Sequence, residues 1–304
     1  MTPSPVFIDR LDRLIDQLER LLPAASAPVD WSAQAFRWRR DAAGRGWLQP
    51  VRAPHRLALA DLRCLERQAA EIERNTRQFL AGGGANNVLL WGARGTGKSS
   101  LVKAVFNAYR DAGLRLIEVD KDDLVALPDI LDLIRDRPER FILFCDDLSF
   151  EAGESGYKAL KAALEGSIAA TPENLLIYAT SNRRHLLPEY QSDNRDSRIQ
   201  DGELHHGEAV EEKISLSDRF GLWISFHPFS QAQYLEVVRH WVERLAPTEV
   251  TRAESDWEPI ERAALQWALR RGARGGRTAW QFARDWAGRG LVDGAACTEV
   301  MPPP

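Results

Sequence analysis

The 304-residue sequence has little cysteine, no long apolar run and no excess of positive charge. Its three cysteines, Cys64, Cys145 and Cys297, are odd in number and far apart, which excludes a disulfide framework and a Cys-x-x-Cys metal site. No apolar stretch approaches the roughly 18–20 residues that span a bilayer, and the first ten residues lack the apolar region of a secretory signal. We therefore expect a cytoplasmic protein without a membrane partner.

The charge is nearly balanced, because 40 Lys and Arg residues face 44 Asp and Glu residues for a net charge of −4. This balance argues against a protein that coats nucleic acid through its overall charge, although a local basic patch remains compatible with it. Hydrophobic residues make up 44% of the chain, which is enough for a substantial core. The length fits about two structural units.

Residues 1–54 are predicted to form an N-terminal helical extension and a linker. Residues 5–22 place apolar side chains three and four positions apart, which predicts an amphipathic helix. Such a helix packs on its own domain or binds a partner, and two heptads are too few to indicate a coiled coil. Residues 31–47 combine tryptophans with arginines. We favour packing against a neighbouring domain over base stacking, because nothing else here resembles a nucleic-acid module.

Residues 55–228 are predicted to form an α/β core. Short apolar runs alternate there with helical segments, and buried strands joined by helical crossovers make a parallel sheet with both faces covered. A polar segment at 189–213 is predicted to be a mobile loop. We expect a five-stranded parallel sheet with helices on both faces, with its strands at residues 88–91, 114–119, 141–145, 175–180 and 222–226.

Residues 229–304 are predicted to form a small helical lid subdomain and a C-terminal tail. Ser230 and Gln233 have the spacing of a capping box, in which each side chain accepts a hydrogen bond from the other residue's backbone N–H. This predicts a helix that reaches about Leu245. Two more helices are expected near residues 256–271 and 277–288.

The strongest chemical signal follows the first of these strands, where residues 92–99 match the pattern G-x-x-x-x-G-K-[ST] between a strand and a helix. Glycines let backbone N–H groups face phosphate oxygens, and the helix N-terminus adds partial positive charge. Lys98 is expected to neutralise the β- and γ-phosphates of a nucleotide. The predicted nucleotide-binding residues are Gly92, Ala93, Arg94, Gly95, Thr96, Gly97, Lys98, Ser99 and Ser100.

A second signal lies about fifty residues further on, where a buried apolar strand ends in Asp146 and Asp147. An apolar strand that delivers an acid at its carboxyl end is the Walker B arrangement, so Asp146 and the Ser99 hydroxyl are expected to hold Mg²⁺. Asp147 is expected to orient the attacking water as a general base. Glu151 and Glu154 are alternatives for that role, because Asp is shorter than the Glu more common at this place.

Three more residues complete the predicted catalytic set of Asp147, Asn182, Arg219 and Arg277. Asn182 follows the strand at 175–180 and suits a group that holds the lytic water against the γ-phosphate. Arg219 lies too far along the sheet edge to serve its own nucleotide easily, and would suit a neighbouring subunit as an arginine finger in trans. Arg277, in the first turn of the last helix, could reach back to the phosphates.

With these motifs the chain resembles the AAA+ ATPases over residues 55–290. The Asp-Asp pair and the Ser-Asp-Arg-Phe-Gly run also resemble bacterial replication initiators and helicase loaders. The resemblance implies a P-loop NTPase fold, ATP and Mg²⁺ as cofactors, sensor roles for Asn182 and Arg277, and a ring or filament assembly. More closely, nearly the whole chain resembles a bacterial family of predicted AAA+ ATPases of unknown function, through residues 36–39, 86–100, 144–150 and 180–185.

We therefore expect an ATPase that remodels or loads a protein or nucleoprotein partner, as an ATP-dependent homo-oligomer with an unknown protein client. The alternative is a slow-turnover, ATP-dependent switch or adaptor that recruits a partner without acting as a motor. A GTPase is disfavoured, because the place of its Asn-Lys-x-Asp guanine reader carries Ser-Asn-Arg-Arg at 181–184. The initiators' C-terminal helix-turn-helix has no counterpart here, so sequence-specific DNA binding is not indicated.

Overall fold

The computed structural model describes residues 28–150, 154–165, 171–184, 186, 198–200, 203–205, 216–245 and 257–298. The helix predicted at 5–22 lies outside the described residues. So does nearly all of the loop predicted at 189–213. Within that loop, β7 (Arg198–Gln200) and β8 (Glu203–His205) pair as an antiparallel hairpin.

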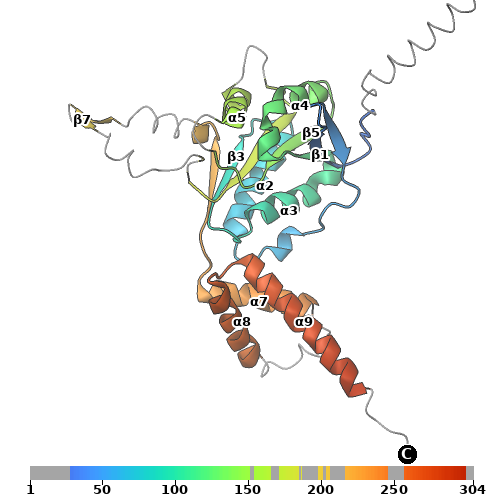
Figure 1. Ribbon diagram of the computed structural model, residues 1–304, viewed down its shortest axis with the longest axis vertical. Coiled ribbons are helices and arrows are strands. Elements are labelled where there is room, and N and C mark those ends of the chain that lie inside the picture. The colour runs from blue at the N-terminus through green and yellow to red at the C-terminus, as the bar shows by residue number, and fades with distance from the viewer. Residues whose placement is uncertain are drawn as a thin grey trace, which may run out of the picture.

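A seven-stranded sheet lies at the centre of the core, with strand order β2-β1-β4-β5-β6-β3-β9 (Figure 1). β2 (Gly46–Pro50) closes one edge as the antiparallel partner of β1. The other pairings are all parallel. The parallel strands are β1 (Ala35–Arg40), β3 (Val88–Gly92), β4 (Leu114–Glu118), β5 (Arg140–Cys145), β6 (Leu175–Ser181) and β9 (Leu222–Phe226).

The five predicted strands are all present, but the sheet has two more, β1 and β2, which the prediction of five missed. Phe36 and Trp38 of β1 are each 1% exposed, because alternate residues of a strand point to the same face. The intervening Arg37 pairs with Glu118 of β4 at 2.6 Å. The aromatic residues therefore pack into the core on one face of β1, and the arginines that alternate with them lie on its other face.

Helices cover both faces of the sheet, as predicted. α2 (Glu66–Leu80) and α3 (Lys98–Tyr109) share one hydrophobic cluster with Val88 and Leu90 of β3. Leu89 of the same strand joins the opposite cluster with α4 (Leu127–Ile134) and α5 (Ser155–Glu165). Short 3₁₀ turns η1 (Leu59–Asp61), η2 (Arg110–Ala112) and η3 (Lys121–Ala126) connect these elements.

Three helices form a separate bundle that follows the last strand of the sheet (Figure 1). They are α7 (Gln231–Leu245), α8 (Trp257–Arg271) and α9 (Gly276–Thr298). The predicted capping box is present before α7, since the Ser230 N–H donates to Gln233 Oε1 at 3.0 Å and the Gln233 N–H donates to Ser230 Oγ at 3.2 Å. Within the described part of the chain, no helix is long and apolar enough to cross a membrane.

Several polar contacts join this lid to the core. The backbone N–H of Arg277 donates to the carbonyl of Gly95 in the phosphate loop at 3.3 Å. Arg244 of α7 donates to the buried carboxylate of Asp61 in η1. The first turn of α9 is thereby held directly against the phosphate loop.

Candidate functional site

The phosphate loop joins β3 to α3 through glycines in backbone conformations that other residues rarely adopt. Gly92, Gly95 and Gly97 have φ angles of +131°, +75° and +101°. A Cβ atom on Gly92 would lie 1.9 Å from the carbonyl oxygen of Phe226 in β9, so only glycine fits there. A glycine-rich turn that opens a helix gathers backbone N–H groups into an anion-binding concavity.

Lys98, the first residue of α3, has a buried side chain at 7% exposure. Its Nζ donates to the carbonyl oxygens of Gly92 and Ala93, both at 2.8 Å, and to Asn182 Oδ1 at 3.1 Å. Burial lowers the pKa of this ammonium group, and nearby carboxylates only partly oppose that change. The chain therefore holds a desolvated cation against neutral oxygens, and a phosphate group would compensate its charge better.

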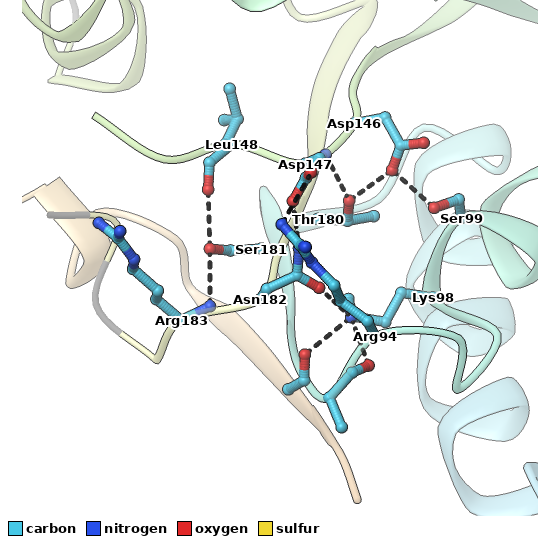
Figure 2. Close-up of polar contacts among 12 residues, drawn as sticks. Arg94, Lys98, Ser99, Asp146, Asp147, Leu148, Thr180, Ser181, Asn182 and Arg183 are labelled. Carbon is cyan, nitrogen blue, oxygen red and sulfur yellow. Dashed lines mark hydrogen bonds and ion pairs between the residues drawn. The ribbon is translucent and has the colours of Figure 1, made fainter. Parts of the chain in front are cut away.

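Asp146 lies just beyond the carboxyl end of β5 and accepts two hydrogen bonds (Figure 2). The Ser99 hydroxyl donates to Asp146 Oδ1 at 2.6 Å, and the Thr180 hydroxyl donates to the same oxygen at 2.5 Å. These bonds bring the two residues predicted to hold a metal into contact.

The Ser99 and Asp146 oxygens fit Mg²⁺. Among the described residues, no group of three or more His, Cys, Asp or Glu side chains could hold a metal ion by itself. Mg²⁺ does not need such a group, because it keeps several waters and takes one or two protein oxygens together with substrate phosphates. The pair at the strand end is of that kind.

Asp147 is one of two described non-glycine residues with a positive φ, at +53°. Its backbone N–H donates to Thr180 Oγ1 at 2.8 Å, which holds this uncommon conformation. Its carboxylate accepts a hydrogen bond from Asn182 Nδ2, and its Oδ2 lies 3.9 Å from Arg94 Nη2 (Figure 2). The acid predicted as the base is thus held between the end of β6 and the phosphate loop.

Thr180, at the end of β6, is a site residue that the sequence analysis missed. It is 1% exposed and bonds to both aspartates, as a donor to Asp146 and as an acceptor from the backbone of Asp147. The available signal was its place next to Asn182 at the end of a buried strand, where a hydroxyl can reach the acids of the adjacent strand.

A cavity of about 830 Å³ connects the phosphate loop, the strand ends and the lid. Three lid residues line this cavity: Arg277 in the first turn of α9, Trp280 of α9 and Trp241 of α7. The charge of Arg277 lies close enough to Lys98 to lower the pKa of that ammonium group further. The structure therefore brings Arg277 together with the loop, Asp146, Asp147 and Asn182.

Arg219 is not part of this cavity. Its Nη2 donates to the carboxylate of Glu165 at the end of α5, and its side chain is 22% exposed. Glu154, one alternative for the base, pairs with Lys121 Nζ at 2.8 Å and does not line the cavity either. Glu151, the other alternative, lies outside the described residues.

The arrangement suits the binding of a polyphosphate and the activation of a water beside it. Cations and backbone N–H groups gather at the loop, and two carboxylates with different partners follow the end of β5. Asp146 accepts hydrogen bonds from two hydroxyl groups, one of which belongs to Ser99, the other predicted metal ligand. Asp147 instead faces an amide and an arginine.

Two of the solved structures that resemble the chain come from a bacterium and an archaeon. The Thermotoga maritima RuvB Holliday junction branch migration motor is 13% identical, with 74% of this chain and 70% of that chain covered and a TM-score of 0.40. The Aeropyrum pernix ORC1 protein, solved in complex with DNA, is 13% identical, with 76% of this chain and 61% of that chain covered and a TM-score of 0.50. At this identity the likeness to the ORC1 structure concerns the fold alone, and the fold is the AAA+ fold expected from the sequence.

No curated protein matches the chain. A family model does match it, over residues 31–290, and this range takes in β1 and β2, the phosphate loop, both aspartates and the part of α9 that carries Arg277. The protein accordingly belongs to the family described as "Protein of unknown function (DUF815)", and it has the AAA+ fold.

Proposed function

We propose that this protein binds ATP with Mg²⁺ and hydrolyses it, and that hydrolysis drives the remodelling or loading of a protein or nucleoprotein partner in the cytoplasm. One observation carries the proposal: the buried Lys98 lies beside Asp146, Asp147 and Asn182 at the carboxyl edge of the sheet. A desolvated ammonium favours a polyphosphate, and the adjacent carboxylates suit a metal and a water.

In the proposed reaction the loop N–H groups and Lys98 bind the β- and γ-phosphates, and Ser99 and Asp146 hold the metal. Mg²⁺, when bound, neutralises charge on these phosphates. Asp147 orients a water and accepts its proton as the water oxygen bonds to the γ-phosphorus. The bond from that phosphorus to the β–γ bridging oxygen breaks, and ADP leaves with its electrons. Asn182 holds the water, and Arg277 approaches the phosphates from the lid.

We also propose an ATP-dependent homo-oligomer, either a ring or a filament, in which Arg219 of one subunit serves the nucleotide of the next. Arg219 would first exchange Glu165 of its own chain for the γ-phosphate of its neighbour. An arginine supplied in trans stabilises charge that develops in the transition state. Assembly and hydrolysis would then depend on each other.

The client of the proposed reaction is a protein or a nucleoprotein. The ORC1 structure contains DNA, which brings nucleic acid into the candidates for this chain. The net charge of −4 provides no overall attraction to a phosphate backbone, so a nucleic-acid contact would rest on a local basic surface.

A slow-turnover switch is the second candidate, and one observation favours it. The carboxylate of Asp147 is already bonded to Asn182, and Arg219 is already paired with Glu165. A chain that keeps both pairs after ATP binds would hold its nucleotide for long periods and recruit a partner in that state.

Phosphate release over many turnovers tests the proposal, with wild type, Asp147→Asn and Glu154→Gln compared. We expect repeated turnover in wild type and a loss of about 10²-fold or more in Asp147→Asn, with ATP binding retained, because the amide keeps the shape but cannot accept the proton. Glu154→Gln is the matched control, since Glu154 pairs with Lys121 outside the cavity. A wild type that stops after one turnover favours the switch. Hydrolysis that survives in Asp147→Asn refutes the assignment of the base.

A further inference from the structure

Arg94 occupies the third position of the phosphate loop, between Gly92 and Gly95, and lines the same cavity as Lys98. Its side chain extends from the loop toward Asp147 (Figure 2). A residue at this place is carried by the backbone that binds phosphate, so its distance from the terminal phosphate is set within one chain and does not depend on assembly.

The contacts that fix the Arg94 side chain are weak. Its side chain is 81% exposed, and its contact with Asp147 is a 3.9 Å ion pair, too long for a hydrogen bond. Within the described residues its guanidinium makes no hydrogen bond, so its donors remain available to a planar or tetrahedral anion. An exposed ion pair of this length contributes little stability, and Arg94 loses little when it turns away from Asp147.

Other arginines around the cavity are more firmly engaged. Arg244 donates to the buried Asp61, and Arg63 donates to His240 Nδ1 at 3.4 Å, so both are tied between the core and α7. Arg94 is instead close enough to the reacting end of the site for its charge to lower the pKa of Lys98. Its position beside Lys98 and Asp147 therefore distinguishes Arg94 from exposed arginines elsewhere on the protein.

We propose that Arg94 is a catalytic residue that acts on the nucleotide of its own chain: on ATP binding its guanidinium leaves Asp147 and binds the γ-phosphate oxygens. This inference rests on the proposed function. This movement of the Arg94 side chain has two effects. It frees Asp147 to orient the water, and it adds a cation where charge spreads over the transferring phosphoryl group. Arg94 and Arg219 then act on the same reaction from two subunits.

The test compares Arg94→Ala, Arg94→Lys and Arg74→Ala in the full-length chain. Arg74 is an exposed arginine of α2 outside the cavity, and its loss removes the same charge. In Arg94→Ala we expect kcat to fall about 10²-fold, whereas the Kd of ATP should change less than threefold. ADP with aluminium fluoride mimics the transition state, so its affinity should fall by about the same factor as kcat. Arg94→Lys should recover part of the rate, and Arg74→Ala should match wild type.

A mixing experiment separates action within a chain from action across an interface. Arg94→Ala mixed with Lys98→Ala should give no more activity than the two alone, because both changes damage the same site. Restored activity would place Arg94 at the neighbour's nucleotide and overturn the inference.

A kcat within threefold of wild type in Arg94→Ala, or a kcat loss matched by an equal loss of ATP affinity, would also overturn it. A wild type that releases no phosphate refutes the proposed hydrolysis and this role with it. Turnover in wild type with an unaffected Arg94→Ala refutes the role of Arg94 alone.

Discussion

Arg94 and Arg219 lie in different parts of the core, Arg94 on the phosphate loop after β3 and Arg219 before the start of β9, and the contacts that hold them differ. Arg94 lies on the phosphate loop with a long, exposed contact to Asp147. Arg219 is partly buried and donates to Glu165, away from the cavity. A close, partly buried pair costs more to break than a long, exposed one. The difference teaches that Arg94 can leave its partner at little cost, whereas Arg219 leaves Glu165 only if another event releases it.

The largest expected effect concerns Arg219. Arg219→Ala should bind ATP normally and hydrolyse it about 10³-fold more slowly, because an arginine finger contributes roughly 10³–10⁵ in rate. Mixing it with Lys98→Ala should restore activity, since an intact Lys98 in one subunit then meets an intact Arg219 in its neighbour. Steady-state phosphate release measures both, and specific activity in wild type should rise with protein concentration as subunits assemble.

Glu165→Gln is the matched control for that result. It breaks the same pair and keeps the arginine, so it should retain hydrolysis if Arg219 acts in trans. If Glu165→Gln is as inactive as Arg219→Ala and mixing rescues nothing, the pair only stabilises its own chain. The contrast with Arg94 would then be between a catalytic and a structural arginine.

The mixing experiments with Arg94 and Arg219 variants also require a subunit that cannot bind nucleotide at its own site. The Lys98→Ala variant should be such a subunit. The Kd of ATP with Mg²⁺ should rise tenfold or more, about 1.4 kcal/mol upward, because the change deletes the buried cation of the loop. Isothermal titration calorimetry measures this. Unchanged affinity would contradict the phosphate-loop assignment and remove the basis of both mixing experiments.

The smallest expected effect is on the thermal stability of a Lys98 variant without nucleotide. This measurement shows whether a Lys98 variant fails to bind ATP because it has lost the binding group or because it has lost the fold. Burial lowers the pKa of Lys98 below its ordinary 10.5, so the unfolded chain binds more protons than the folded chain just below pH 10.5. The free energy of unfolding therefore contains a contribution from Lys98 that rises with pH through that window. Lys98→Met should lack this rise and unfold at an equal or slightly higher temperature at pH 7. A clear loss of thermal stability would show that Lys98 supports the fold.

The predicted strands illustrate what periodicity reveals. The five strands found from the sequence are short apolar runs, and β3, β5 and β6 among them are buried along almost their whole length. A short run that is apolar on both faces indicates a strand inside a covered sheet. β1 was missed because only one set of its alternate residues, including Phe36 and Trp38, is apolar, while Arg37 and Arg39 occupy the other set. Alternation over a few residues is a weaker signal than a continuous apolar run, and the mixture of tryptophan and arginine was interpreted as packing against a neighbouring domain.

By itself the sequence determined the phosphate loop, because its glycines and Lys98 act through backbone angles within a few residues of each other. It also determined that Asp146, Asp147 and Asn182 share one edge, since the carboxyl ends of parallel strands meet there. Only the tertiary structure decided that Thr180 bridges the two aspartates, that Arg219 meets Glu165 and that Arg94 faces Asp147. These contacts join residues between 33 and 54 positions apart, as in Thr180–Asp147 and Arg219–Glu165. They depend on the order and register of strands and helices, which a local pattern of side chains does not contain.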